Sequence, residues 1–529
     1  MISICLIFSS ILSFAQENNV QVKWGKKQRL GKNTSLGNPV AFEDGNLYML
    51  KRKPRKLFSK TAKYEIARYN DNMALEKILP LELKEGKKWK TLDQVVYMKE
   101  EMVLFSSFKN QKLKKNFLFF QTIDKKTLKP NNDLKKIAEI DYSDNSRYNA
   151  GNYGFEMSRD STKFMVYYNL PYNKKEKEKF GFHVYDQQMN TLWNKNITLP
   201  YTDKLFHVGD YELDNEGNVH IIGRIFKDRV KLERFGKPNY KFEILSYYDQ
   251  GNSLEKYQIQ TEDKFLTDMQ IAISDEQNII CSGFYSDEGT YSVKGSFFFK
   301  IDRESKAIIS KNYSEFSIDF ITQHMKPGKQ KRIKKRAKKG KNRELYEYDL
   351  RDIIIKDDGG IVMIAEQFYI RVVTNTRTNS NGITATTTSY HYYYNDIIVV
   401  NISADGTFKW TEKIAKKQHT VNDDGHYSSY DVAVVGDKLH FIFNDHKKNM
   451  EYKGDGKRLR YYKGKKSKSL AVMVTLDANG KQSKKALFSV KDKKMYLRPK
   501  FCKQLLANQV LVYGQKGRNH YLGKMTFVD

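Results

Sequence analysis

The segment FGFHVYDQQMNTLWNKNITL, residues 180–199, contains two runs of largely alternating apolar and polar side chains separated by a short turn. Alternation with a period of two is typical of β-strands that bury one face. The first run ends at Asp186, and an aspartate there can accept backbone N–H groups in the turn after a strand. We therefore interpret the segment as two antiparallel strands joined by a tight turn.

The first half of this pattern recurs along the sequence. Alternating runs that end in aspartate occur eight times, about 65 residues apart on average, and a hairpin with a short turn precedes each one. Each unit thus predicts strand a, a short turn, strand b, a longer loop, strand c, a short turn and strand d, which suits a four-stranded propeller blade. The closing aspartates are Asp71, Asp124, Asp186, Asp249, Asp302, Asp405, Asp477 and Asp529.

The composition agrees with a large β-structure. Hydrophobic residues make up 40% of the 529 residues, and 35 Tyr with 31 Phe favour strands. We expect an all-β fold in which residues 16–529 form a single β-propeller of about eight four-stranded blades, with seven blades as the alternative.

The last repeat, GKMTFVD, ends at Asp529 without a strand d. The early segment QVKWGKKQRL resembles NTLWNKNITL in its alternation, with Trp24 at the place of Trp193. Pairing the two ends would remove exposed strand edges. We predict that an N-terminal strand closes the ring, with Val20–Leu30 pairing with Gly523–Val528.

The first sixteen residues, MISICLIFSSILSFAQ, carry no charge and place Ser13 and Ala15 where a cleavage site requires small side chains. We predict a signal peptide at residues 1–15 and an exported chain that is periplasmic, associated with the outer membrane or extracellular. No later run approaches the roughly 20 apolar residues of a transmembrane segment. Beyond Cys5 only Cys281 and Cys502 remain, which excludes a disulfide scaffold.

The repeats SADGTFKW, residues 403–410, and YDQQMNTLW, residues 185–193, resemble the Asp-turn-Gly-to-Trp repeat of quinoprotein-like eight-bladed propellers. That superfamily includes pyrroloquinoline-quinone dehydrogenases and a propeller subunit of the outer-membrane barrel-assembly machinery. The dehydrogenases use a vicinal cysteine pair and a calcium site against the quinone, whereas Cys281 and Cys502 lie in different repeats. The resemblance therefore implies the fold and argues against quinone chemistry.

Long insertions fall on one side of the predicted ring. The b–c and d–a loops share one rim, and nearly every insertion is in such a loop, whereas the a–b and c–d turns are short. Because loops on a rigid scaffold often carry function, we expect the elaborated rim to be the functional one. The insertions are residues 169–180, 227–241, 317–346, 372–395 and 444–468.

The insertion 317–346 contains KPGKQKRIKKRAKKGKNR, residues 326–343, with eleven Lys or Arg and no acid, in a chain of net charge +31. It lacks the apolar periodicity of an amphipathic helix, so we expect a loop. The loop could bind an anionic glycan or lipid, or it could be merely solvated. Export and the absence of interleaved aromatics argue against nucleic acid in vivo. The candidate residues are Lys331, Arg332, Lys334, Lys335, Arg336, Lys338 and Lys339.

Two other sets of polar residues are candidates for ligand binding. Aspartates near the start of strand a could form a ring at the channel mouth that binds calcium or a lysine-bearing partner, although backbone bonding is the favoured interpretation. No other cofactor is expected. A second set, next to strands a and b of the seventh repeat, could form a metal or acid/base site. The first set is Asp93, Asp210, Asp268, Asp352 and Asp431; the second is Asp424, His426, Asp445 and His446.

Motifs for catalysis are sparse. The sequence has no G-x-S-x-G, no phosphate-cradling glycine loop and no paired-glutamate signature. We expect a non-catalytic propeller of the cell envelope that presents its elaborated rim to an envelope protein or to an anionic glycan or lipid. The alternative is a propeller hydrolase or lyase that acts on glycans.

Overall fold

The computed structural model describes residues 19–528 apart from residues 33, 54–62, 86–87, 99–100, 132, 142–150, 172–174, 229, 235–236, 260–263, 288, 290–291, 341–343, 379, 382–383 and 455–457. The expected signal peptide, residues 1–15, lies outside the described residues, as does the end of the basic segment, residues 341–343.

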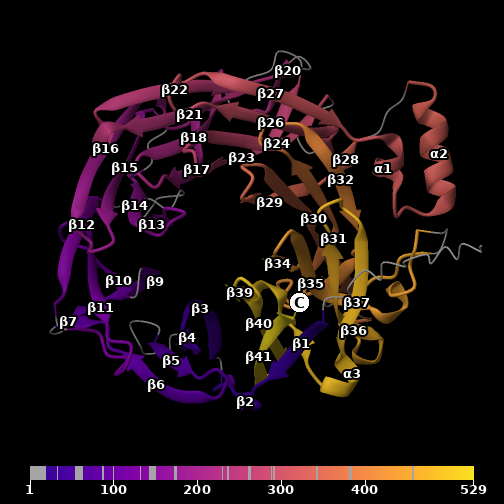
Figure 1. Cartoon of the computed structure of the whole chain (residues 1–529), viewed down its shortest axis with the longest axis horizontal. Coiled ribbons are helices and arrows are strands. Elements are labelled where there is room, and N and C mark those ends of the chain that lie inside the picture. Colours follow the sequence, from indigo (N-terminus) through magenta and orange to yellow (C-terminus); the bar gives the residue numbers. More distant parts are fainter. Residues whose placement is uncertain are drawn as a thin grey trace, which may run out of the picture.

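The described strands form a ring of eight antiparallel sheets, each with four to six strands (Figure 1). The sheets follow one another around the ring in chain order. In the first seven sheets the first strand lies nearest the centre and the fourth lies on the circumference, whereas in the last sheet the outermost strand comes from the N-terminal segment (Figure 1). The prediction of an all-β propeller is confirmed.

The first four sheets contain these strands, from the centre outwards: β3 (Ser35–Glu43), β4 (Asn46–Lys53), β5 (Lys63–Tyr69) and β6 (Leu75–Leu81); β9 (Thr91–Met98), β10 (Glu101–Asn110), β11 (Lys115–Ile123) and β12 (Lys135–Asp141); β13 (Tyr153–Met157), β14 (Lys163–Asn169), β15 (Lys177–Asp186) and β16 (Thr191–Thr202); β17 (Phe206–Leu213), β18 (Val219–Phe226), β21 (Tyr240–Tyr248) and β22 (Ser253–Ile259).

The next four sheets contain β23 (Phe265–Ile273), β24 (Ile279–Ser286), β26 (Gly295–Ile301) and β27 (Ile308–Glu315); β29 (Tyr348–Ile355), β30 (Ile361–Thr378), β31 (Thr384–Ile402) and β32 (Phe408–Ile414), with β33 (Gln418–Val421) added to β31; β34 (Asp431–Val435), β35 (Lys438–His446), β36 (Ser469–Leu476) and β37 (Gln482–Ser489); β38 (Tyr496–Leu497), β39 (Lys503–Leu506), β40 (Gln509–Lys516), β41 (Asn519–Val528), β1 (Asn19–Trp24) and β2 (Gln28–Arg29).

Shorter elements lie in the connections between the strands of the eight sheets. Three two-stranded ribbons pair β7 (Lys84–Glu85) with β8 (Lys88–Trp89), β19 (Glu233–Arg234) with β20 (Lys237–Pro238), and β25 (Ser292–Val293) with β28 (Leu345–Tyr346). The helices are α1 (Ile318–Thr322), α2 (Pro327–Ala337) and α3 (Val490–Lys493), with the 3-10 turns η1 (Asp249–Gly251), η2 (Lys447–Asn449), η3 (Lys466–Lys468) and η4 (Pro499–Phe501).

Apolar side chains fill the spaces between neighbouring sheets. Ile222 and Ile244 of one sheet, for example, belong to the same buried cluster as Ile271 and Phe297 of the next. The middle strands are covered on both faces, so all eight residues of β24 are buried. Cys281, in β24, and Cys502, just before β39, are free, buried thiols.

The N-terminal strand closes the ring, as predicted. β1 pairs with β41 in antiparallel register from Val20 opposite Phe527 to Trp24 opposite Gly523. β2 continues the pairing, with Gln28 opposite His520. The last sheet therefore joins segments from opposite ends of the described chain.

The expected equivalence of Trp24 and Trp193 is wrong. Trp193 lies opposite Val184, two residues before Asp186, whereas the residue opposite Phe527, two residues before Asp529, is Val20. Trp24 is four residues further along its strand, where its ring packs edge-on against Phe488 at 5.5 Å.

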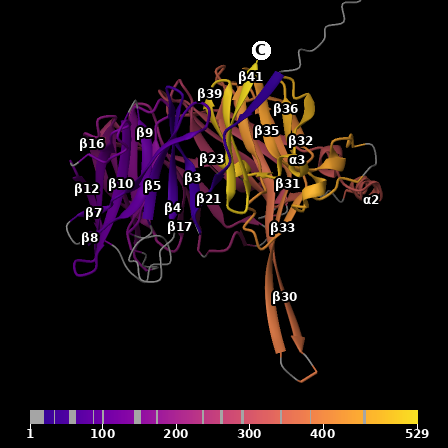
Figure 2. The same ribbon diagram turned by 90° about the horizontal axis from the view of Figure 1, so that it is seen from below.

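The insertion 372–395, expected as a loop, is β-structure. β30 and β31 extend beyond their sheet as a twisted hairpin that projects from one side of the ring (Figure 2). We call residues 370–378 and 384–390 of this hairpin the arm. Every side chain from Ile370 to Thr378 is exposed, which removes the apolar alternation that would have marked a strand. Its pairing rests on β-branched residues, including three directly opposed threonine pairs.

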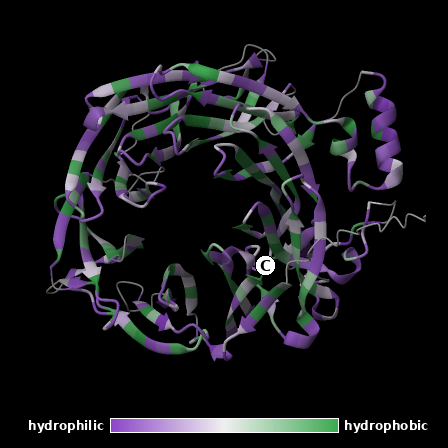
Figure 3. Cartoon of the chain, viewed as in Figure 1, coloured by the Kyte–Doolittle hydropathy of each residue, from purple (hydrophilic) through white to green (hydrophobic). Residues whose placement is uncertain are grey.

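The basic segment is a helix, not the expected loop. α2 begins with Pro327 in its first turn and contains mostly Lys, Arg, Gln and Ala, which have high helix propensity. Its last turn is basic, which complements the helix dipole. Ile333 is its one buried residue, so the sequence shows no apolar stripe. The helix lies outside the ring as a mostly hydrophilic element (Figures 1 and 3).

Candidate anion-binding site

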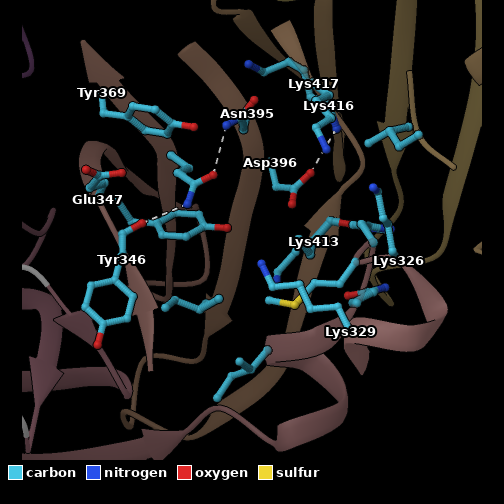
Figure 4. A pocket seen from close by; sticks show the side chains of 18 of the residues that line it. Lys326, Lys329, Tyr346, Glu347, Tyr369, Asn395, Asp396, Lys413, Lys416 and Lys417 are labelled. Carbon is cyan, nitrogen blue, oxygen red and sulfur yellow. Dashed lines mark hydrogen bonds between the residues drawn. The ribbon is translucent and has the colours of Figure 1, made fainter. Parts of the chain in front are cut away.

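Three of the insertions meet around a cavity of about 890 Å³, which we call the basic cavity (Figure 4). They are the connection that carries α1 and α2, the base of the arm, and the segment between β35 and β36. The cavity is lined by Ile321, Gln323, His324, Met325, Lys326, Lys329, Glu344, Leu345, Tyr346, Glu347, Tyr348, Gln367, Tyr369, Asn395, Asp396, Lys413, Lys416, Lys417, Arg458, Leu459 and Tyr461.

Hydrogen bonds hold these insertions against one another. His324, between α1 and α2, lies 3.2 Å from the Lys413 carbonyl through Nε2 and 3.2 Å from the Tyr452 hydroxyl through Nδ1. Tyr462 donates its backbone N–H to the Lys417 carbonyl at 2.8 Å and accepts from His419 N at 3.0 Å. An isolated backbone bridge between residues 417–419 and Tyr462 therefore joins two parts of the cavity wall.

Four cationic side chains from three separate segments line the basic cavity. Lys326 and Lys329 come from the start of α2, Lys417 from the connection between β32 and β33, and Arg458 from the segment after β35. Burial lowers the pKa of Lys417; Asp396 opposes the shift, and Arg458, Lys329 and Lys326 add to it by repulsion. The four charges are thus close enough to disfavour one another.

Two further lysines near this connection, Lys413 in β32 and Lys416 just after it, have structural roles. Lys413 is 1% exposed, donates to the Phe320 carbonyl at 2.7 Å and lies 4.4 Å from the Phe320 ring centre. Burial lowers its pKa to about 8. Lys416 and Glu366 are both fully buried and form an ion pair at 2.6 Å. Lys413 fixes α1 to the ring, and Lys416 fixes the interior of its own sheet.

Hydrogen-bonding and acidic groups share the cavity with the cations. Asp396 and Glu347 lie on its wall with Tyr346 and Tyr369 (Figure 4). The Gln367 amide donates to the Tyr346 carbonyl at 2.9 Å and accepts from Asn395 at 3.1 Å. The basic cavity therefore offers both positive charge and acceptors for a ligand's donors.

A second hollow of about 280 Å³ adjoins the basic cavity and shares Arg458, Leu459 and Tyr461 with it. We call it the adjoining hollow. Its remaining wall is strongly basic, so the two hollows form a continuous basic surface. The residues that line only the adjoining hollow are His446, Arg460, Lys463, Lys465, Lys468 and Ser469.

The predicted basic residues lie on α2 and in the turn that follows it, outside the basic cavity. Lys334 is half-buried and pairs with Asp319, while the other six are exposed. Of the described residues in the basic segment, Lys326 and Lys329 reach the cavity wall. The six exposed residues are Lys331, Arg332, Lys335, Arg336, Lys338 and Lys339.

The predicted aspartates occupy the innermost strands. Asp93, Asp210, Asp268 and Asp352 sit at register shifts in strand a of their sheets, and Asp431 begins β34. Asp268 Oδ2 accepts a hydrogen bond from Leu350 N of the next sheet at 2.9 Å. This contact is of the backbone-bonding kind that was favoured for these aspartates.

Burial raises the pKa of Asp93 to about 6 and that of Asp431 to about 7, so each binds a proton more readily than an ordinary aspartate. Burial is also the first cause of the raised pKa of Asp210 and Asp352. Within the described part of the chain, no three His, Cys, Asp or Glu side chains are grouped so that they could hold a metal ion.

The second predicted polar set is divided between separate networks. Asp424 Oδ1 accepts from the Tyr392 hydroxyl at 2.6 Å. Asp445 accepts from Lys484 at 2.6 Å and from Asn449 at 2.7 Å. Burial and Arg498 lower the pKa of His426, and His446 Nδ1 accepts from Lys448 N at 3.2 Å. None of these described contacts joins Asp424 or His426 to Asp445 or His446.

Sequence reasoning missed Lys417, Arg458, Tyr461 and Asp396. A local signal exists for Arg458 and Tyr461, which lie in the basic 444–468 insertion. The site is assembled by pairing between residues 417–419 and 462, and such contacts leave no periodicity in the sequence.

No family model matches this chain, and no curated protein matches it. Solved structures similar to it include the β-propeller domain of the Trilobed protease from Pyrococcus furiosus, at 12% identity over 90% of this chain and all of that one, with a TM-score of 0.37. The Dos1 propeller is 9% identical over 96% of this chain and 95% of that one, with a TM-score of 0.41. The WD40 domain of SCAP from fission yeast is 8% identical over 96% and 94%, with a TM-score of 0.37. The fold assignment rests on the strand pairing itself.

No helix among the described residues is long and apolar enough to cross a membrane.

Proposed function

We propose that this chain is a non-catalytic binding propeller that holds an anionic partner on its elaborated rim, at the basic cavity. The observation that carries the proposal is the convergence of Lys326, Lys329, Lys417 and Arg458 from three separate segments of the chain on one cavity.

Bringing four like charges together costs free energy, and a bound anion would lower that cost. Asp396 offsets part of the repulsion at Lys417. An anionic group in the cavity would replace repulsion by charge-assisted hydrogen bonds, each stronger than a neutral one. The helix α2 adds a positive field around the entrance, which would speed the encounter with a polyanion.

The proposal also covers the type of propeller, its location and its partner. We take the eight sheets as the eight blades of a quinoprotein-like propeller, acting in the cell envelope after export. Its partner would be an anionic glycan, an anionic lipid or an acidic protein surface, and the arm beside the cavity would limit which of these can approach.

The test compares two double variants that remove the same charge. Binding of fluorescent polygalacturonate, heparin and anionic vesicles is measured at about 150 mM salt, where long-range attraction is screened. Lys417→Gln with Arg458→Gln should weaken the tightest of these interactions at least about tenfold, because it removes two direct contacts. The control, Lys331→Gln with Lys335→Gln on the exposed face of α2, should weaken it less than about threefold. Equal losses in the two variants would mean that net charge alone drives binding.

A further inference from the structure

The basic cavity and the adjoining hollow form one path. They meet at Arg458, Leu459 and Tyr461, and the path continues along cationic side chains of the segment 460–468. A small anion would occupy one end of such a path and leave the other end unneutralised. Only an extended molecule with repeated charges would fill both hollows.

The path is not uniformly positive. Asp396 and Glu347 share the cavity wall with the cations, and Asp396 lies close enough to Lys417 to affect its pKa (Figure 4). A uniformly charged polymer would be repelled at these two carboxylates. A chain whose anionic groups are separated by hydroxyl groups would instead donate hydrogen bonds to them.

Aromatic rings face the same path. Tyr461 stands where the two hollows meet, and its ring is held edge-on to the stacked pair Tyr393 and His419, at 6.4 Å and 6.0 Å. Tyr346, on the cavity wall, is 41% exposed. Rings that are fixed before binding lose little entropy when a flat partner packs on them. The apolar face of a sugar ring is such a partner.

The arm restricts how a ligand can approach. Tyr369, at the base of the arm, lines the basic cavity, and nine further residues of β30 extend away from the ring (Figure 2). At the usual strand rise, this projection is about 30 Å long. A flat bilayer that met this rim would touch the tip of the arm while its headgroups were still several Debye lengths from the cavity, each about 8 Å. A slender chain meets no such obstacle.

We propose that the ligand is a linear acidic polysaccharide that runs from the basic cavity past Tyr461 into the adjoining hollow. Its acidic groups pair with Lys329, Lys417 and Arg458, and its hydroxyl groups donate to Asp396. This assignment rests on the function proposed above and narrows it to one chemical class.

Calorimetric titration with four probes tests the class. An oligogalacturonide should bind at least about tenfold more tightly than a neutral oligogalactan of equal length, because the latter lacks the acidic groups. It should also bind about tenfold more tightly than a polyglutamate peptide of equal charge, which lacks hydroxyl groups and sugar rings. Phosphatidylglycerol vesicles represent the lipid source of negative charge and should bind more weakly than the oligogalacturonide.

Substitutions at two residues should change the binding of the oligogalacturonide and of polyglutamate differently. Asp396→Asn should weaken the oligogalacturonide but tighten polyglutamate, since it removes an acceptor for hydroxyl groups and also a repulsive charge. Tyr461→Leu should weaken the oligogalacturonide about fivefold or more, and Tyr461→Phe should restore binding. Tyr390→Leu, on the exposed arm, is the matched control and should change nothing. Melting temperatures of all variants separate lost binding from lost structure.

The outcomes distinguish this inference from the broader proposal. If polyglutamate or vesicles bind as tightly as the oligogalacturonide, and still depend on Lys417 and Arg458, the polysaccharide assignment is overturned while anion binding at the cavity stands. If no probe depends on Lys417 and Arg458, both proposals fail.

Discussion

The closing seam of the ring can be tested by one pair of residues. The indole ring of Trp24 covers Gly523, and a Cβ added at Gly523 would lie 2.8 Å from Trp24 Cε3 and 3.0 Å from its Cδ2. The first distance is shorter than Cβ contacts in real proteins and the second is at that limit, so the ring must shift. Gly523→Ala should therefore destabilise the protein by about 1–3 kcal/mol, the usual cost of overpacking.

Removing the ring should have its own cost. Trp24 is half-buried and contacts Phe488, so Trp24→Ala should cost about 2–3 kcal/mol, somewhat less than for a fully buried tryptophan. In the double variant the new methyl group enters space that the indole has left. The double variant should therefore be destabilised by about 1–2 kcal/mol less than the sum of the two single variants.

The assay is urea unfolding of the wild type, both single variants and the double variant, followed by circular dichroism. Gly328→Ala is the control, because nothing lies within 4 Å of a Cβ at that position in α2, and it should be neutral or slightly stabilising. If Gly523→Ala costs the same with and without the tryptophan, the described contact across the seam is incorrect.

Three more expectations concern the arm, a buried histidine and a contact between sheets. Replacing residues 372–390 by an Asn-Gly turn, which keeps Arg371 opposite His391, should change the free energy of unfolding by less than about 1 kcal/mol in calorimetry, since the arm is exposed; a larger loss would show that it supports the ring. Burial lowers the pKa of His520 to about 4, so the unfolded chain binds the proton first and stability should fall by up to about 3 kcal/mol between pH 6.5 and pH 4; His520→Phe should remove that part of the decline in urea titrations at the two pH values. Asp268→Ala should cost about 1–3 kcal/mol in the same assay by leaving Leu350 N without its acceptor, whereas Asp210→Ala, whose partner is the adjacent Tyr211 N, should cost less.

The fold was predictable wherever a strand has one covered face or ends at a turn with local chemistry. Val20 and Val22 show the alternation that places β1 on β41, and the turn after Asp186 follows from its carboxylate, which accepts two backbone N–H groups. The position of Trp24 was not predictable, because alternation does not determine how far a strand slides along its neighbour.

The arm and α2 could not be predicted from the sequence because neither has an apolar stripe. The arm is exposed on both faces, and Ile333 is the one buried residue of α2, so neither has a period that a sequence pattern could reveal. The basic cavity depends on contacts between residues far apart, such as His324 with Tyr452. Charge counting found the lysines of α2 and not the fewer cations that face the cavity.

The register of the closing strands has a mechanical consequence. Asn19 and Val528 lie directly opposite each other, at the same end of the antiparallel pair formed by β1 and β41. Tension applied through these two residues would load the backbone hydrogen bonds one at a time, like a zipper, instead of shearing all of them together. The molecule should therefore open at low force along this line while the rest of the ring stays intact, and an attachment through its loops would bear far more load than one through its ends.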